Sequence, residues 1–329
     1  MISAILRRAA LQTRLNLRII GAAWLLNVLL ALLLAVPFLN QLDRALAPTA
    51  REEELVRSFD VNWYRTWQFD NEANPLARMF DASTFGAAPF IHHLDGMVSG
   101  TTLLPVVRTV QAFLPGLRID PSRLSLLILL ALLYAFGSAF LAGGFLSVYA
   151  AGLRATTSEF IADGTRYFGR MVRIMLVGFI LVGAVVALGA ALSGAIAERT
   201  ANDPSEWTPY VLHLCRNGLL LVLLWCVGIG LDYGRVRMVL DERRSAVFAV
   251  GAGFRFAAAR AGRVVGVSVA VLALVGILMG AAGYALEEMN ASSYGTIALV
   301  FVVQQLFVAA RMGVRAFGYA GVVEVARER

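Results

Sequence analysis

Lysine is absent from the sequence of 329 residues, so all 29 basic side chains are arginine. Cysteine and histidine are scarce, with two and three copies. Cys215 and Cys226 lie in one apolar stretch, about 16 Å apart along a helix, which is beyond disulfide reach. We find no phosphate loop, GxSxG, HExxH or dinucleotide fingerprint, and no Cys/His set with metal spacing. The sequence therefore predicts no disulfide, cofactor or metal and offers no catalytic signature.

Charge is also scarce, whereas long apolar runs are abundant. Charged residues make up 16% of the chain and hydrophobic residues 59%, and the mean hydropathy is +0.71. Such a chain is expected in lipid. Six runs are long enough to cross a hydrocarbon core about 30 Å thick; we place them at 19–40, 124–149, 174–196, 211–231, 264–285 and 295–316.

These runs predict the fold class. Only helices and closed barrels span lipid, and the runs are too long for barrel strands. We expect an all-α polytopic membrane helical bundle of about six transmembrane helices, with interfacial amphipathic helices and a small helical outer subdomain. The expected divisions are 1–40, the outer segment 41–123, and a five-helix region 124–329. That region would hold two similar hairpins, 124–196 and 211–285, and the last span.

The arginines predict the orientation. With the N-terminus inside, the segments 1–18, 150–173, 232–263 and 311–329 hold 19 arginines and 7 acidic residues. The outer segments hold 10 arginines and 15 acids, and eight of those arginines lie in the long segment 41–123, which carries little topological weight. Both termini are therefore expected on the cytoplasmic side of the membrane.

Two cytoplasmic connections combine aromatic residues with arginine, as interfacial helices do beside anionic lipid. They follow the second and fourth spans and suggest a repeat of a descending span, an interfacial helix and an ascending span. The segment 2–18 would be the interfacial part of a third copy. The candidate lipid-contacting arginines are Arg166, Arg170, Arg173, Arg243, Arg244, Arg255 and Arg260.

The two connections, Gly143–Arg173 and Leu231–Arg263, resemble bacterial multi-pass inner-membrane proteins and the membrane domain that precedes some glycerophosphodiester phosphodiesterases. The resemblance covers about residues 120–325. It implies a helical bundle in the inner membrane. It transfers no active residue, because it does not extend to a phosphodiesterase domain.

A few polar residues lie within the predicted spans: Asn27, Gln304, Gln305, Arg311 and Arg315. The amides either bond across helices or contact a substrate. Arg311 and Arg315 share a helical face, where they either bind a lipid phosphate or extend to the interface. Small residues spaced four apart predict close helix packing: Gly230 with Gly234, Gly262 with Gly266, Gly276 with Gly280, and Ala190 with Gly194.

The outer segment holds the one group that suggests acid–base or metal chemistry, formed by His92, His93 and Asp95 near Asp81. Adjacent histidines share neither a helix face nor a strand face, and no third spaced ligand follows. We expect no metal there. An outer-face enzyme using these residues is the weakest of three functional hypotheses.

The leading hypothesis is a non-enzymatic membrane component, a complex subunit or a scaffold that organises lipid or partner proteins. Its partners would be membrane lipids and either another protein or a second copy of the chain, without nucleic acid. The alternative is a permease-like subunit for an apolar or lipid-like substrate, driven by a separate ATPase. A water-facing path lined by Asn27, Gln304 and Arg311 would favour the alternative.

Overall fold

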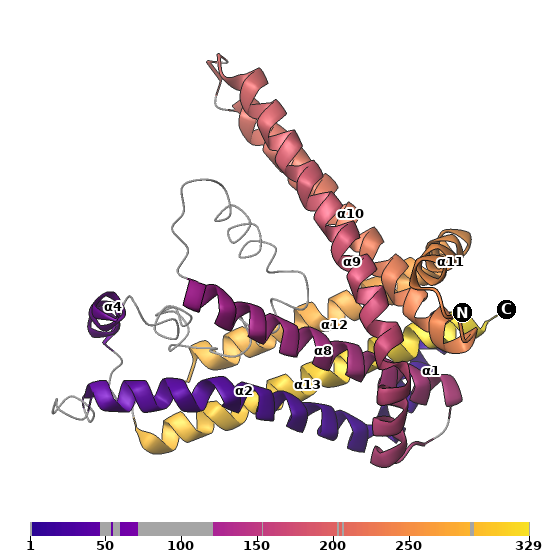
Figure 1. Ribbon diagram of the computed structural model, residues 1–329, viewed down its shortest axis with the longest axis horizontal. Coiled ribbons are helices and arrows are strands. Elements are labelled where there is room, and N and C mark those ends of the chain that lie inside the picture. The colour runs from indigo at the N-terminus through magenta and orange to yellow at the C-terminus, as the bar shows by residue number, and fades with distance from the viewer. Residues whose placement is uncertain are drawn as a thin grey trace. The chain divides into compact units, whose positions relative to one another are not determined.

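The computed structural model describes residues 2–46, 54, 60–71, 121–152, 154–202, 204–205, 207–289 and 293–328, and these residues form helices without any strand (Figure 1). The all-α prediction is confirmed. The helices are α1 (Ile2–Leu15), α2 (Leu17–Leu46), α4 (Val61–Asp70), α8 (Pro121–Ala151), α9 (Thr157–Thr200), α10 (Trp207–Leu240), α11 (Ala246–Ala259), α12 (Ala261–Glu287) and α13 (Tyr294–Arg327).

Six of these helices are long and apolar enough to cross a membrane, as predicted. The apolar spans lie in α2, α8, α9, α10, α12 and α13. The helices extend beyond the predicted spans, because hydropathy marks the part that matches lipid whereas backbone bonding continues to the next capping signal. The interfacial helix expected before the third span is the beginning of α9, which is continuous over 44 residues.

The chain forms two compact units, which divide several helices. The first contains residues 1–16, 139–270 and 316–329, and the second contains 17–138 and 271–315. In the second unit, Leu30 of α2 packs against Gly137 of α8. Most of the outer segment 41–123 lies outside the described residues. Its described part includes α4, whose N-terminal N–H groups are capped by the Asp60 carboxylate.

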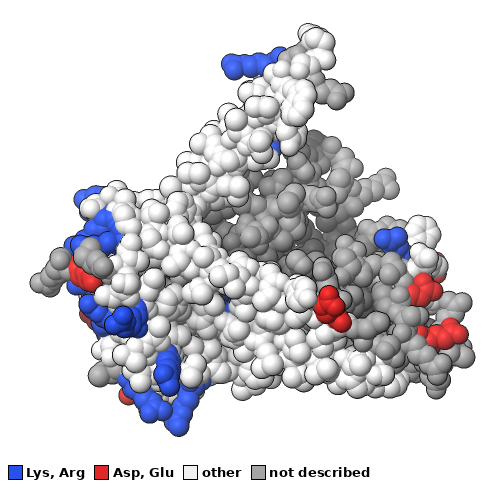
Figure 2. Space-filling view, turned by 180° about the vertical axis from the view of Figure 1, so that it is seen from behind, with Lys and Arg blue, Asp and Glu red and all other residues white. Residues whose placement is uncertain are grey.

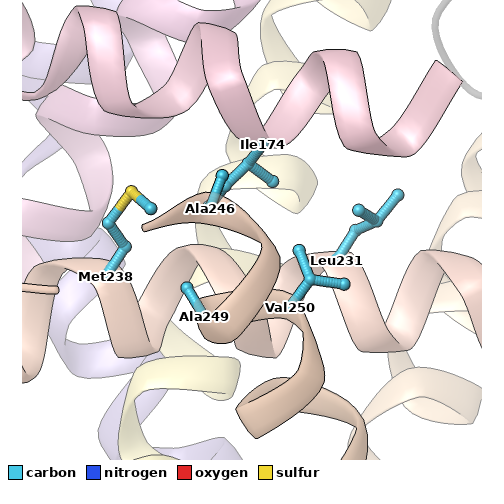
Figure 3. Close-up of a cluster of buried hydrophobic side chains, with 6 residues drawn as sticks. All are labelled: Ile174, Leu231, Met238, Ala246, Ala249 and Val250. Carbon is cyan, nitrogen blue, oxygen red and sulfur yellow. The ribbon is translucent and has the colours of Figure 1, made fainter. Parts of the chain in front are cut away.

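The first unit is built around the antiparallel hairpin of α9 and α10, with α11 packed beside it (Figure 1). A buried apolar cluster joins the three helices (Figure 3). It takes Ile174 from α9, Leu231 and Met238 from α10, and Ala246, Ala249 and Val250 from α11. Small residues on α11 let its backbone approach α10 closely.

Local signals in the sequence explain how these helices begin and end. Thr156 and Glu159 form a capping box at the N-terminus of α9, since each side chain bonds the other's backbone N–H. Gly152 ends α8 with φ +72°, and its N–H donates to Val148 O at 3.2 Å. The turn from α10 to α11 contains Glu242 with φ 48°.

Two glycine contacts recur at one spacing. A Cβ on Gly144 would lie 2.6 Å from the ring of Phe160, and a Cβ on Gly234 would lie 3.0 Å from the Cα of Val250. Each contact joins residues sixteen apart, and Gly234 follows Gly144 by 90 residues (234 − 144). The helix before the connection therefore packs on the helix after it in the same way for α8 with α9 and for α10 with α11.

The same shift of 90 residues relates a second pair of contacts. Phe140 packs on Gly164 in the first hairpin, and Phe254 packs on Gly230 in the second. Positions 140 and 164 correspond to 230 and 254, so the ring and the glycine have exchanged helices. Such an exchange fills the same space between the two helices, although the equivalent positions of the two hairpins no longer hold the same residues.

Candidate functional site

Glu324 of α13 is a buried carboxylate in the first unit, with 5% of the residue exposed. Its Oε2 lies 3.6 Å from Nη1 of Arg8, and its Oε1 lies 3.5 Å from Nη1 of Arg327. Gln12 donates a hydrogen bond of 3.0 Å from Nε2 to Oε1. A buried carboxylate is costly unless it is paired and hydrogen-bonded, and Glu324 is both.

Glu328, one turn later, extends this group to α12. Its carboxylate lies 3.9 Å from Arg8 and 3.6 Å from Arg263. We call Arg8, Gln12, Arg263, Glu324, Arg327 and Glu328 the terminal polar cluster. Because it contains three arginines and two glutamates, the cluster keeps one net positive charge.

Two further contacts join the two ends of the chain to the end of α8 and to the connection that follows it. Arg327 donates to the carbonyl oxygen of Ala150, in the last turn of α8, where a cation stabilises the helix terminus. Asn16, which is 3% exposed, accepts a bond of 3.1 Å from the Ala155 N–H. Its own amide nitrogen donates to Gln12 O at 2.9 Å. The N-terminal helix is therefore joined to the connection between α8 and α9.

The predicted interfacial arginines also belong to the first unit, where basic side chains gather around α1, α11 and the beginning of α9 (Figure 2). Arg166 pairs with Glu242 at 3.0 Å, and Arg173 donates to the carbonyl oxygen of Arg244 at 3.0 Å. The structure thus brings α9 to the turn that precedes α11. Arg243 is held by Asp241 at 3.1 Å.

Two buried aromatic rings each lie beneath a pair of guanidinium groups. Arg166 and Arg170 lie 5.3 and 5.4 Å from the centroid of Tyr167. Arg237 and Arg260 both lie 4.6 Å from the centroid of Phe256. Cation–π contacts of this kind hold guanidinium groups in place without neutralising them. Arg255 is exposed.

The polar residues predicted within the spans lie in the second unit. Gln304 is 7% exposed, whereas Asn27 and Gln305 are half-buried. Arg311 approaches the sulfur of Met279 at 3.8 Å, and Arg315 approaches the hydroxyl of Tyr134 at 3.4 Å. Both arginines are half-buried, so they take part in helix contacts.

The structure adds no candidate metal centre within the residues it describes, where no group of three or more His, Cys, Asp or Glu could hold a metal ion. His92, His93 and Asp95 lie outside those residues. The hypothesis of an outer-face enzyme therefore stays a prediction.

The terminal polar cluster was not predicted from the sequence. Arg8, Arg327 and Glu324 were counted only as charges that set the orientation. One signal was available: Glu324 interrupts an apolar stretch from Tyr319 to Ala326, where an unpaired carboxylate would be costly. The partners of Glu324 were not predictable, because Arg8 and Gln12 are more than 300 residues away in the sequence.

Comparison with known protein families, curated proteins and solved structures found no match. The resemblance to bacterial inner-membrane proteins and to the phosphodiesterase membrane domain stays an expectation. What the geometry offers is a multi-pass helical membrane protein whose first unit carries concentrated positive charge.

Proposed function

We propose that the protein is a non-enzymatic component of the bacterial inner membrane that organises anionic lipid through its cytoplasmic arginines. One observation carries the proposal: several exposed arginine side chains of the first unit make no ion pair with any carboxylate that the structure describes. They are Arg7, Arg14, Arg154, Arg244 and Arg255. Guanidinium groups at the ends of apolar helices attract lipid phosphates through their charge and donate hydrogen bonds to them.

Extraction of the tagged protein from its native membrane, followed by mass spectrometry of copurifying lipids and proteins, tests this proposal. We expect anionic phospholipid to be enriched over zwitterionic phospholipid relative to the membrane of origin. Bound lipid matching the bulk composition would contradict the proposal. A stoichiometric ATPase in the same preparation would instead support the permease-like alternative.

The permease-like alternative requires polar side chains that face water along a path through the spans. Gln304 is buried, and Arg311 and Arg315 contact neighbouring side chains within their unit. No observation on these residues favours transport, so lipid organisation is the better-supported function.

The proposal requires both termini to be cytoplasmic, and reporter fusions test this. The N- and C-terminal helices lie together in the first unit, joined by the contacts of Arg8 with Glu324 and Glu328. We expect a fluorescent protein fused after Arg329 to fluoresce and a periplasmic phosphatase fused there to be inactive. A phosphatase inserted after Ala201, between α9 and α10, should be active. The reverse pattern would invert the orientation and reject a cytoplasmic arginine layer.

A further inference from the structure

An open depression of about 860 Å³ lies in the first unit, where α11 bends into α12. It is lined by Ile2 and Ser3 of α1 and by the segment 259–263. Ile2 also packs on α12, because a Cβ on Gly266 would lie 2.6 Å from its Cδ1. The start of α1 therefore forms one wall, and the bend between α11 and α12 forms the other.

Two arginines, Arg260 and Arg263, supply the charge of this depression. Arg260 pairs with no carboxylate in the part of the chain that the structure describes, and the Phe256 ring supports its guanidinium at 4.6 Å. Arg263 shares Glu328 with Arg8, so one carboxylate serves two guanidinium groups. The depression is consequently electropositive.

The chemistry and position of the depression fit one occupant. Arg260 and Arg263 stand immediately before and within the first turn of the apolar span of α12, at the depth expected of lipid headgroups. Guanidinium groups bind phosphate oxygens with paired hydrogen bonds, and Ile2, Ala259 and Ala261 give apolar contact to a glycerol backbone. We infer that the depression binds the phosphate headgroup of an anionic phospholipid. This inference rests on the lipid-organising function proposed above and assigns it a site.

Comparison with the first copy of the internal repeat shows which feature is particular to this depression. The shift of 90 residues places Arg170 and Arg173 of α9 at the positions of Arg260 and Arg263. Both Arg170 and Arg260 stack on a buried ring. However, α9 is continuous at this point, and Arg173 already donates to the carbonyl oxygens of Gly169 and Arg244. The first copy thus has the same arginine pair without the bend that opens the depression.

Native mass spectrometry of the detergent-purified full chain, titrated with phosphatidylglycerol or phosphatidylcholine, tests the inference. We expect Arg260→Gln to weaken the tightest phosphatidylglycerol binding step roughly tenfold, as loss of a charge-assisted bond does. Arg237→Gln removes the same charge from the same Phe256 ring, but Arg237 already pairs with Asp241 at 3.3 Å and does not line the depression, so that step should change by less than about twofold. Phosphatidylcholine binding should be unaffected by either change.

A second variant tests the site without removing a ring contact. Among the residues that the structure describes, no other helix comes within 4 Å of a Cβ placed on Gly262, so Gly262→Asp adds a negative charge without a steric clash. An acidic side chain is also favourable in the first turn of a helix. We expect this variant to keep the melting temperature of the parent protein and to lose the tightest phosphatidylglycerol step.

The outcomes separate the site from the proposed function. Equal phosphatidylglycerol binding by the parent protein, Arg260→Gln and Gly262→Asp would overturn the site and leave lipid organisation standing. A parent protein that binds both lipids equally would overturn the function and the site together. Displacement of the lipid by millimolar inorganic phosphate would show that the depression binds free phosphate and would overturn the assignment to lipid.

Discussion

Gly253→Ala is expected to prevent α11 from packing on α10 and to leave little folded protein in the membrane. A Cβ at this position would lie 2.5 Å from both Gly230 O and Gly234 N. Both are backbone atoms of a helix, so no side chain can rotate away, and the two helices must separate. Overpacking in a core typically costs 1–3 kcal/mol when side chains adjust, and we expect more than about 3 kcal/mol here. Fluorescence-detected size-exclusion chromatography and the yield of extractable protein measure the effect.

Gly251→Ala is the matched control for this prediction. Gly251 lies on the same helix and is exposed, and no neighbouring helix in the described part of the chain comes within 4 Å of a Cβ built on it. Because alanine favours helix over glycine by about 1 kcal/mol, Gly251→Ala should be neutral or slightly stabilising. If Gly253→Ala gave the yield and elution profile of Gly251→Ala, the close approach of α11 to α10 would be wrong.

Spacing in the sequence predicted part of this packing. Gly230 and Gly234, four residues apart, do receive α11, and Gly266 receives Ile2. Gly276 and Gly280 have the same spacing, yet no described atom lies within 4 Å of a Cβ on either. Glycines spaced four apart mark a helix face without side chains. Which of these faces packs against a neighbouring helix depends on the fold, so the close contact of Gly253 with α10 could not be predicted from the sequence.

The fold class and the six spans were predictable because lipid imposes a simple rule on length and hydropathy. Side-chain pairing was not, since it depends on distant segments. The repeat shows why: Leu231 of α10 packs on Gly178, and Gly321 of α13, 90 residues after Leu231, packs on Val267, one residue before the position equivalent to Gly178. The end of α13 therefore packs much as α10 does, with different side chains. In this register, position 324 corresponds to Gly144 and Gly234.

The third copy therefore carries a carboxylate, Glu324, where the other two carry closely packed glycines. A glycine lets the next helix approach, whereas Glu324 attracts α1 through Arg8 and Gln12. The N-terminal helix is separated in sequence from α13, so no turn holds the two together. Charge pairing thus provides the connection that a short loop provides in the other two copies.

Replacement of this carboxylate is the second large effect we expect. Glu324→Gln keeps the shape of the side chain but leaves Arg8 and Arg327 without the charge they share. Glu324 is buried, whereas 56% of the Arg8 side chain is exposed and stays hydrated without its partner, so we expect a loss of about 1–3 kcal/mol. The melting temperature of the purified protein should fall by several degrees, and the N-terminal segment should become more accessible to protease, because α1 loses its main polar contact with α13.

Glu242→Gln provides the comparison, since it removes a carboxylate from an ion pair with Arg166 in which both side chains are about 60% exposed. Exposed pairs contribute about 0–1 kcal/mol, so the melting temperature should hardly change. Equal melting temperatures for the two variants would mean that Glu324 is no more important than a surface charge. A larger loss confined to Glu324→Gln, together with faster cleavage near α1, would identify the terminal polar cluster as what holds the two chain ends together.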